Sequence, residues 1–373
     1  MSQIDIPPPV FSVFNTHEQV TSVRFAPTSP TGPTIMATSN VQGNLRLYHV
    51  SQQEGNEDEG MVPPSSQMVG PQRVQKTEEF RLEMVHEFKD HFFPINDVQF
   101  CPHSRTIQPY MASCGDDTLI NMYDIEKQEL VRNFIGHQSY VTKIKFNNVT
   151  NVLLSCGTDN SLMLWDIRTN KAVFKILGHP EPITSIDISF DNTLICSSSH
   201  DGYVRLWDML KATCLKTMVA DSGSSSAIGL CKMTPNSKYL MFANLNSRIG
   251  IYNYQNELVK QYMGHKNQEY CLEAIFVKHP DTGKSNILVG GEDGTLTGWD
   301  MNSQDVLFQK NIDPATMAGS AAPQAPIIGG GAQSSQTAQK VISTLDYESG
   351  NGLVAACGNF KGVYLSKISN LYQ

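Results

Sequence analysis

The stretch that decides the fold of this chain is SSSHDGYVRLWD, residues 197–208. It places Asp201 in an Asp-Gly turn six residues before Trp207, and His179 stands 22 residues before that turn aspartate. Asp-Gly between two alternating apolar runs indicates a tight hairpin turn. The stretch therefore predicts a strand, a turn and a second strand.

The same spacing recurs along the chain. The turn aspartate and its tryptophan return as Asp159 with Trp165 and as Asp293 with Trp299, six residues apart in both cases, and all three tryptophans of the chain precede Asp. The Gly-His pairs of these units are Gly136-His137, Gly178-His179 and Gly264-His265. A unit of this kind that repeats about every 40 residues is typical of a β-propeller blade. The length of 373 residues therefore predicts an all-β, seven-bladed propeller.

Weaker copies of the unit occupy the rest of the chain. Residues 20–48, 95–124 and 341–357 carry the alternating apolar runs with only parts of the motif. A further copy places Asn246 at the turn position and Tyr252 at the tryptophan position. We interpret these as the four remaining blades.

The ring must also close. Residues 9–14 alternate in polarity, and the last blade, within residues 341–368, is otherwise short. We expect residues 9–14 to supply the outer strand of that blade, because this removes an open sheet edge.

Two segments fit no blade. Residues 51–79 are acidic and polar, and residues 312–338 are rich in Gly, Ala, Ser, Gln and Pro. Both are predicted to be flexible insertions, with a docking segment as the alternative. We therefore expect a single propeller over residues 9–373, preceded by a disordered N-terminus at residues 1–8.

Composition narrows the class of protein. Net charge is −8, which argues against direct nucleic-acid binding because such binding depends on neutralising phosphates. No apolar run is long enough for a membrane helix, and the N-terminus does not resemble a secretory signal. The eight cysteines lack CxxC spacing, so they are interpreted as buried free thiols of an intracellular protein. No metal, cofactor or membrane is expected.

One constellation resembles a catalytic triad. The repeated set is His137, Ser155, Asp159 and Trp165 in one unit, and His179, Ser197, Asp201 and Trp207 in the next. An enzyme needs one triad rather than one in each blade. The set is predicted to be a structural network in which Asp bonds His, His bonds Ser and Ser bonds the Trp N–H. The chain is therefore predicted not to be an enzyme.

At the level of these residues the chain resembles the WD-repeat propellers. Within that class, three runs resemble the WD-repeat scaffold subunit of the histone H3 lysine-4 methyltransferase (COMPASS) complexes. The runs are residues 182–208, residues 234–239 and the Gly-His-Lys-Asn-Gln-Glu-Tyr-Cys segment at 264–271. The resemblance implies a non-catalytic, nuclear scaffold that binds protein subunits, and a monomeric propeller within a hetero-complex.

That resemblance implies two binding faces. One is the channel mouth, where the family holds an arginine side chain, from a histone H3 tail or a methyltransferase subunit, between two phenylalanines. This chain keeps Asp116, Tyr270 and Cys271 there but has Thr142 and Glu273 at the two phenylalanine positions. A threonine offers no cation–π stacking, so arginine capture is in doubt, although Glu273 offers a charge instead.

The other implied face is a groove for a short acidic-hydrophobic peptide of a partner subunit. Its positions here are Asn236, Tyr239, Ile251, Phe276, Lys278 and Asn302. They combine aromatic, aliphatic, amide and cationic groups that suit such a peptide. We predict that this groove matters more than the channel mouth.

Two other functions stay open. Trp165-Asp166-Ile167-Arg168 matches the Trp-Asp-x-Arg pattern of substrate receptors in cullin-4 ubiquitin ligases, although this pattern is common. Leu272-Glu273-Ala274 with Phe276 resembles a sister WD-repeat subunit that is shared with RNA-processing machinery. The expected location is nuclear, with the cytoplasm as the alternative.

Overall fold

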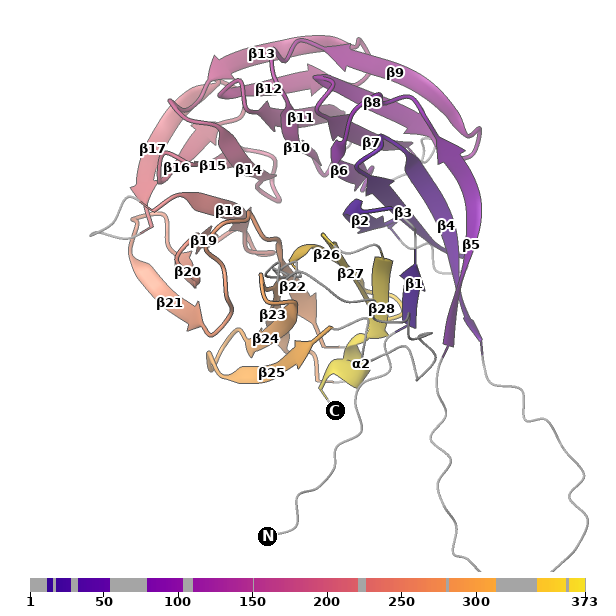
Figure 1. Ribbon diagram of the computed structural model, residues 1–373. Helices are drawn as coiled ribbons and strands as arrows, with labels where there is room; N and C mark the ends of the chain where they lie inside the picture. The colour runs from indigo at the N-terminus through magenta and orange to yellow at the C-terminus, as the bar shows by residue number, and fades with distance from the viewer. Residues whose placement is uncertain are drawn as a thin grey trace, which may run out of the picture.

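The computed structural model describes residues 12–15, 18–27, 33–53, 79–102, 110–149, 151–220, 226–279, 282–312, 341–359 and 362–372. These residues form seven four-stranded antiparallel sheets that stand as blades around a central channel (Figure 1). The prediction of a seven-bladed β-propeller is confirmed.

Each blade runs from a first strand beside the channel to a last strand at the rim. Blade 1 has β2 (Val20–Phe25), β3 (Thr34–Asn40), β4 (Leu45–Gln53) and β5 (Glu79–Phe88). Blade 2 has β6 (Ile95–Phe100), β7 (Tyr110–Gly115), β8 (Leu119–Asp124) and β9 (Glu129–Ile135). Blade 3 has β10 (Val141–Phe146), β11 (Val152–Gly157), β12 (Ser161–Asp166) and β13 (Lys171–Leu177).

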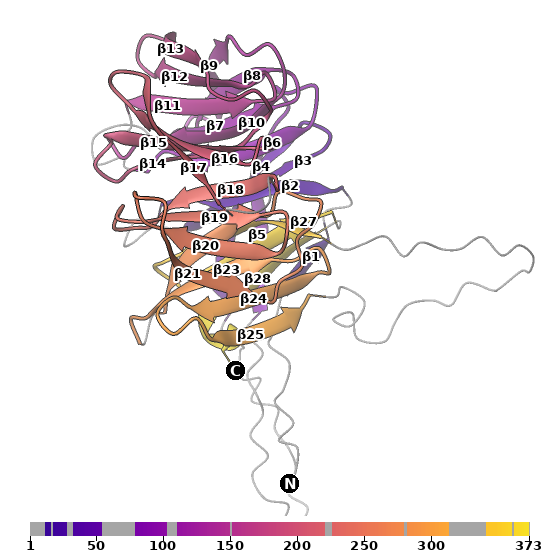
Figure 2. The ribbon, with the colours of Figure 1, turned by 90° about the vertical axis from the view of Figure 1, so that its left-hand side faces the viewer.

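The second half of the ring repeats this order. Blade 4 has β14 (Ile183–Ile188), β15 (Leu194–Ser199), β16 (Tyr203–Asp208) and β17 (Thr213–Val219). Blade 5 has β18 (Ile228–Met233), β19 (Leu240–Asn244), β20 (Arg248–Tyr252) and β21 (Leu258–Met263), which lie side by side in Figure 2. Blade 6 has β22 (Ala274–Lys278), β23 (Ser285–Gly290), β24 (Thr295–Asp300) and β25 (Val306–Asn311).

The N-terminal strand closes the ring. Blade 7 has β26 (Ile342–Glu348), β27 (Leu353–Gly358), β28 (Gly362–Lys367) and, at its rim, β1 (Ser12–Asn15). Ser12 pairs with Leu365 and Asn15 with Gly362 in antiparallel register. The predicted closure is confirmed for residues 12–14, while residues 9–11 lie outside the described part of the chain. The short helix α2 (Ile368–Leu371), which the sequence did not predict, follows β28 and buries Ile368 and Leu371.

The apolar core lies between the blades. It divides into seven clusters, and each of them joins two neighbouring blades. Leu154 and Leu162 of blade 3, for example, pack with Ile195 and Trp207 of blade 4. Because a blade cannot bury both of its apolar faces alone, the stability of each blade depends on its neighbours.

A β-bulge near the start of the inner strands links neighbouring blades through polar bonds. In β10 the register shifts between Val141 and Lys143, and the bulged Thr142 donates from Oγ1 to the carbonyl of Ile183 at 2.9 Å. Thr184 repeats this bond to Ile228 at 2.7 Å. Bulges re-aim side chains, and here they direct the threonine hydroxyls to the neighbouring blade.

The ring has two faces that differ in their loops. We call upper the face with the links between blades, such as residues 136–140, and the turns between second and third strands, such as residues 158–160. The amide of Thr158 donates to the carbonyl of Tyr140 at 2.9 Å and fixes these two segments together. The lower face carries the opposite strand ends, such as residues 189–193.

The borders of both predicted insertions need correction. The β4–β5 pairing continues to Gln53 and Glu79, so only residues 54–78 of the first predicted insertion lie outside the described part of the chain. Ile312 is fully buried in the cluster between blades 6 and 7 and belongs to the core. The propeller therefore includes residues at the ends of both segments that their polar or small-residue composition had assigned to loops. Among the described residues no helix is long and apolar enough to cross a membrane.

Candidate functional site

The predicted Ser-His-Asp sets are closed networks. In blade 4, His179 bonds Asp201 through Nδ1 at 2.8 Å and Ser197 through Nε2 at 2.8 Å, and Trp207 Nε1 donates to Ser197 Oγ at 2.9 Å. Burial lowers the pKa of His179, so its ring is neutral at pH 7. Because the Asp201 carboxylate can only accept, Nδ1 of the neutral ring carries the proton and Nε2 accepts from the Ser197 hydroxyl. Blade 3 repeats the network with His137, Ser155, Asp159 and Trp165.

These serines cannot act as nucleophiles in this arrangement. Ser155 and Ser197 are fully buried, and each hydroxyl already bonds a histidine and a tryptophan. A substrate carbonyl therefore has no path to either oxygen. The networks satisfy buried polar groups and hold the loops that connect the blades.

Blade 2 carries a third network that the sequence prediction missed. His91 bonds Asp117 and Ser113 at 2.7 Å in both cases, while Tyr123 stands at the tryptophan position. The residue before His91 is Asp rather than Gly, and the histidine lies 26 residues before its aspartate. The spacing from Ser113 to Asp117 equals that from Ser155 to Asp159 in blade 3, and this match could have indicated the network from the sequence.

Blade 6 departs from the network although its sequence keeps the motif. His265 is buried with no hydrogen-bond partner among the described residues, and its ring packs edge-on against Trp299 at 5.7 Å. Burial lowers the pKa of His265 to about 4. The strand position that carries serine in blades 3 and 4 holds Val289 here, so the hydroxyl that would link the two rings is missing.

A buried carboxylate organises the loop that distinguishes blade 6. Glu292 is 1% exposed and accepts hydrogen bonds from the amides of Gln268, Glu269 and Tyr270 at 2.8, 2.6 and 2.8 Å. Its own amide donates to the carbonyl of Lys266 at 2.9 Å. Glu292 thus fixes the longer link at residues 264–271.

The predicted channel-mouth residues differ in exposure and in bonding. Tyr270 is 45% exposed and Cys271 is exposed on the upper face, whereas Asp116 accepts a bond from Asn96 Nδ2 at 2.8 Å. Glu273, on the channel side just before β22, is the residue whose predicted role requires correction.

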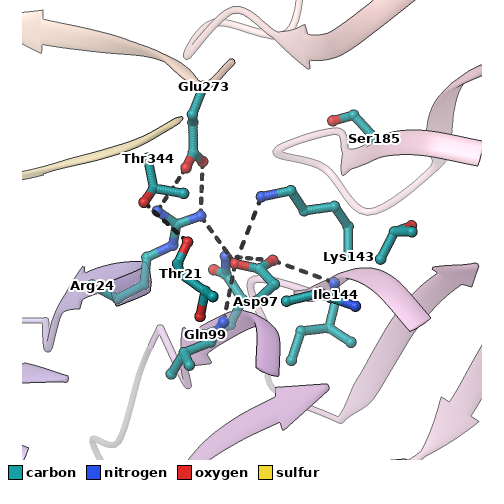
Figure 3. A network of polar contacts seen from close by, with 12 residues as sticks. Thr21, Arg24, Asp97, Gln99, Lys143, Ile144, Ser185, Glu273 and Thr344 are labelled. Carbon is teal, nitrogen blue, oxygen red and sulfur yellow. Dashed lines mark hydrogen bonds and ion pairs between the residues drawn. The ribbon is translucent and has the colours of Figure 1, made fainter. Parts of the chain in front are cut away.

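Glu273 is paired with an arginine of the same chain. Arg24, on β2, donates to both Glu273 oxygens at 2.8 and 2.9 Å and to Asp97 at 3.1 Å (Figure 3). It also donates to the carbonyl of Leu345 at 3.2 Å. One guanidinium from blade 1 therefore joins blades 2, 6 and 7.

The charges of this network stabilise one another. Burial would raise the pKa of Glu273, but Arg24, Lys143 and Lys232 together lower it to about 2. Burial alone would lower the pKa of Arg24. The attraction of the surrounding carboxylates, with that of Glu273 the strongest, outweighs this effect and raises the pKa. The carboxylate that the sequence offered to a basic ligand is thus already neutralised internally.

Three stretches of the chain match a family model described as WD domain, G-beta repeat: residues 82–124, 128–166 and 170–208. Each stretch contains the rim strand of one blade and the three inner strands of the next. The chain is a seven-bladed propeller with WD repeats. The offset between repeat and blade explains why β1 must complete blade 7. Propellers of this kind generally act as non-catalytic scaffolds for protein interactions.

In this WD-repeat propeller the predicted groove residues lie around one cluster between blades 5 and 6. Tyr239 and Phe276 are partly buried against it, and Lys278 and Asn302 are exposed. Asn236 Oδ1 accepts from Thr234 Oγ1 at 2.7 Å and holds a turn. Ile251 requires correction because it is 2% exposed and belongs to the core rather than to a groove wall.

Below the Arg24–Glu273 pair the WD-repeat propeller encloses a cavity of about 250 Å³. Its charged lining comes from all seven blades: Arg24, Asp97, Lys143, Lys145, Asp187, Lys232, Glu273 and Asp346. Pro27, Pro102 and Asn148, which lie in lower-face links, border the same space. The described residues contain no group of His, Cys, Asp and Glu side chains placed to hold a metal ion.

Proposed function

We propose that this chain is the WD-repeat scaffold subunit of a nuclear histone H3 lysine-4 methyltransferase (COMPASS-like) complex. The observation that carries the proposal is the 264–271 segment. A generic blade does not require this sequence, and Glu292 holds it through three amide bonds. A scaffold with no chemical step of its own is consistent with the internally bonded Ser-His-Asp sets.

The lower groove is the better candidate for binding a partner subunit. Tyr239 and Phe276 are anchored in one apolar cluster and still reach its surface. Lys278 is exposed beside Phe276, so the region offers both an apolar and a cationic contact. Anchored aromatic side chains are common hot spots of protein interfaces.

The upper channel mouth is the weaker candidate. The Thr142 hydroxyl donates its hydrogen bond to the carbonyl of Ile183 in the neighbouring blade, and both Glu273 oxygens accept from Arg24. An incoming arginine would find neither a stacking ring at these two positions nor a free carboxylate at Glu273.

Affinity purification of the tagged full-length chain from nuclear extract, followed by mass spectrometry, tests the proposal. We expect histone-methyltransferase subunits to co-purify, and we expect Lys278→Glu to reduce their recovery because it reverses an exposed charge. The matched control is Lys171→Glu on the rim strand β13. Recovery of no methyltransferase subunit would contradict the proposal.

A ubiquitin-ligase receptor is the second candidate. Arg168 follows the buried Trp165, and its side chain is 83% exposed on the lower face, where an adaptor could contact it. Recovery of a cullin-4 adaptor that depends on Arg168 would favour this function. Recovery of RNA-processing factors would instead favour a WD-repeat subunit of an RNA-processing complex.

A further inference from the structure

The cavity in the channel presents cations although its formal charges balance. The carboxylates of Asp97, Asp187 and Glu273 are only 1%, 9% and 11% exposed. The side chains of Lys143 and Lys145 are 22% and 35% exposed. Asp346, the fourth carboxylate of the lining, is partly buried and accepts from the amide of Phe25 at 2.6 Å. Three of the four carboxylates are thus less exposed than the side chains of Lys143 and Lys145.

The carboxylates also have their bonds within the fold. Asp97 accepts from Arg24 at 3.1 Å and from the amide of Val98 at 3.0 Å. Asp187 accepts from the amide of Met233 at 2.9 Å and pairs with Lys145 at 3.3 Å. These acids are structural acceptors, so they offer little to a cationic ligand.

Lys232 is the cation with the weakest neutralisation. Its ammonium donates to the carbonyl of Ala274 at 3.2 Å and forms no ion pair with any residue of the described ranges. Burial lowers its pKa more than the attraction of Glu273 raises it. A buried ammonium without a carboxylate partner is costly, and a bound anion would offset that cost.

The cavity has room for such an anion and an opening to the lower face. A second hollow of about 280 Å³ shares Lys145, Asp187 and Lys232 with the first and extends to Phe190, which is 72% exposed. A water molecule takes about 30 Å³ of liquid, so either hollow exceeds the size of a small oxyanion. Access from below does not require the Arg24–Glu273 pair to open.

We propose that the lower half of the channel binds a small phosphate-bearing anion of the pyrophosphate class through Lys143, Lys145 and Lys232. Lysine ammonium groups are common phosphate ligands, and the partly enclosed channel strengthens their attraction relative to that at an open surface. Three ammonium groups favour a ligand that carries several negative charges, such as pyrophosphate, over a ligand that carries one carboxylate. The site shares no lysine with the proposed partner groove.

Calorimetric titration of the full-length chain with pyrophosphate tests the proposal. We expect saturable binding and a rise in melting temperature, with affinity reduced at least tenfold in Lys232→Gln and in Lys143→Gln. The control Lys171→Gln, which removes an exposed lysine on β13, should stay within twofold of wild type. Absence of binding to the folded wild type, or an equal loss in Lys171→Gln, would overturn the proposal.

A measurement on the wild type covers the case in which a lysine variant does not fold. Pyrophosphate should protect Lys143, Lys145 and Lys232 from a lysine-acylating reagent, while Lys171 remains fully reactive. Unchanged acylation of the three channel lysines at saturating pyrophosphate would overturn the assignment. A phosphoserine peptide that protects them better than pyrophosphate would overturn the small-molecule assignment.

Discussion

Arg24 has the widest reach of the side chains described above. It bonds acidic groups or carbonyls of three other blades from a side chain that is 7% exposed. Arg24→Met would leave the Glu273 and Asp97 carboxylates buried without their main counter-charge. We expect a loss of about 3–5 kcal/mol in the free energy of unfolding, measured by urea denaturation.

An exposed ion pair supplies the control for Arg24. Arg81 and Glu83 are paired at 3.3 Å with side chains about 60% exposed, and Arg81→Met should cost less than about 1 kcal/mol. Equal effects of Arg24→Met and Arg81→Met would show that the channel network does not stabilise the ring.

Glu273 predicts an acid-sensitive component of stability. Its pKa falls from 4.5 to about 2 on folding, so its contribution is complete above pH about 4.5 and is lost as pH falls towards 2. A shift of this size corresponds to about 3 kcal/mol. Unfolding free energies measured from pH 5 to 2 should therefore fall less steeply in Glu273→Gln than in wild type. Parallel curves would contradict the assignment.

The turn aspartates provide a matched comparison. Asp201→Ala removes the partner of the buried His179 and should cost about 1–3 kcal/mol. Asp293→Ala is the control, because His265 has no bond to Asp293 and that carboxylate caps its own turn through Thr295. We expect a clearly smaller drop in melting temperature for Asp293→Ala. The reverse order would contradict the structural role of the network.

At the residue scale the repeat made the networks of blades 3 and 4 predictable. Each joins residues of one repeating unit at a fixed spacing. The Arg24–Glu273 pair could not be found this way, because its partners lie 249 positions apart and meet only when the ring closes. His265 shows the opposite failure, since its motif is present but the serine it needs is replaced by Val289.

At the scale of elements, β1 is the closure of the ring. A chain that lacks residues 1–15 would expose the edge of β28 and the apolar cluster between blades 7 and 1. We expect a lower melting temperature and concentration-dependent association in size-exclusion chromatography, since an open edge can pair with another chain. A control lacking only residues 1–8 should remain monomeric and keep the wild-type melting temperature.

Strand positions were predictable from alternation, whereas their ends were not. The β4–β5 hairpin extends to Gln53 and Glu79, past the polar sequence that marked a loop. Backbone pairing across a hairpin does not require apolar side chains at its end, so composition underestimated its length. The six-residue expansion between His265 and Asp293 was visible in sequence, but its anchoring by Glu292 required the fold.

At the scale of the whole molecule, the two faces of the channel differ. The upper mouth is supported by bonds between blades and by the Arg24–Glu273 pair beneath it. The lower half holds the cavity with Lys143, Lys145 and Lys232 in its lining. The second hollow, which shares Lys145 and Lys232, also contacts Phe276. The sequence offered Glu273 as a charge at the channel mouth without revealing that Arg24 neutralises it. This asymmetry is why we place the partner contact on the lower face.

A binding titration with two peptides tests that placement most directly. One peptide is an arginine-bearing histone H3 tail and the other is a short acidic-hydrophobic segment, each titrated against wild type, Phe276→Ala and the upper-face control Phe92→Ala. The account predicts that the acidic-hydrophobic peptide binds wild type and Phe92→Ala alike and binds Phe276→Ala at least tenfold more weakly, while the histone peptide binds weakly throughout. Tight binding of the histone peptide that is insensitive to Phe276→Ala would contradict it.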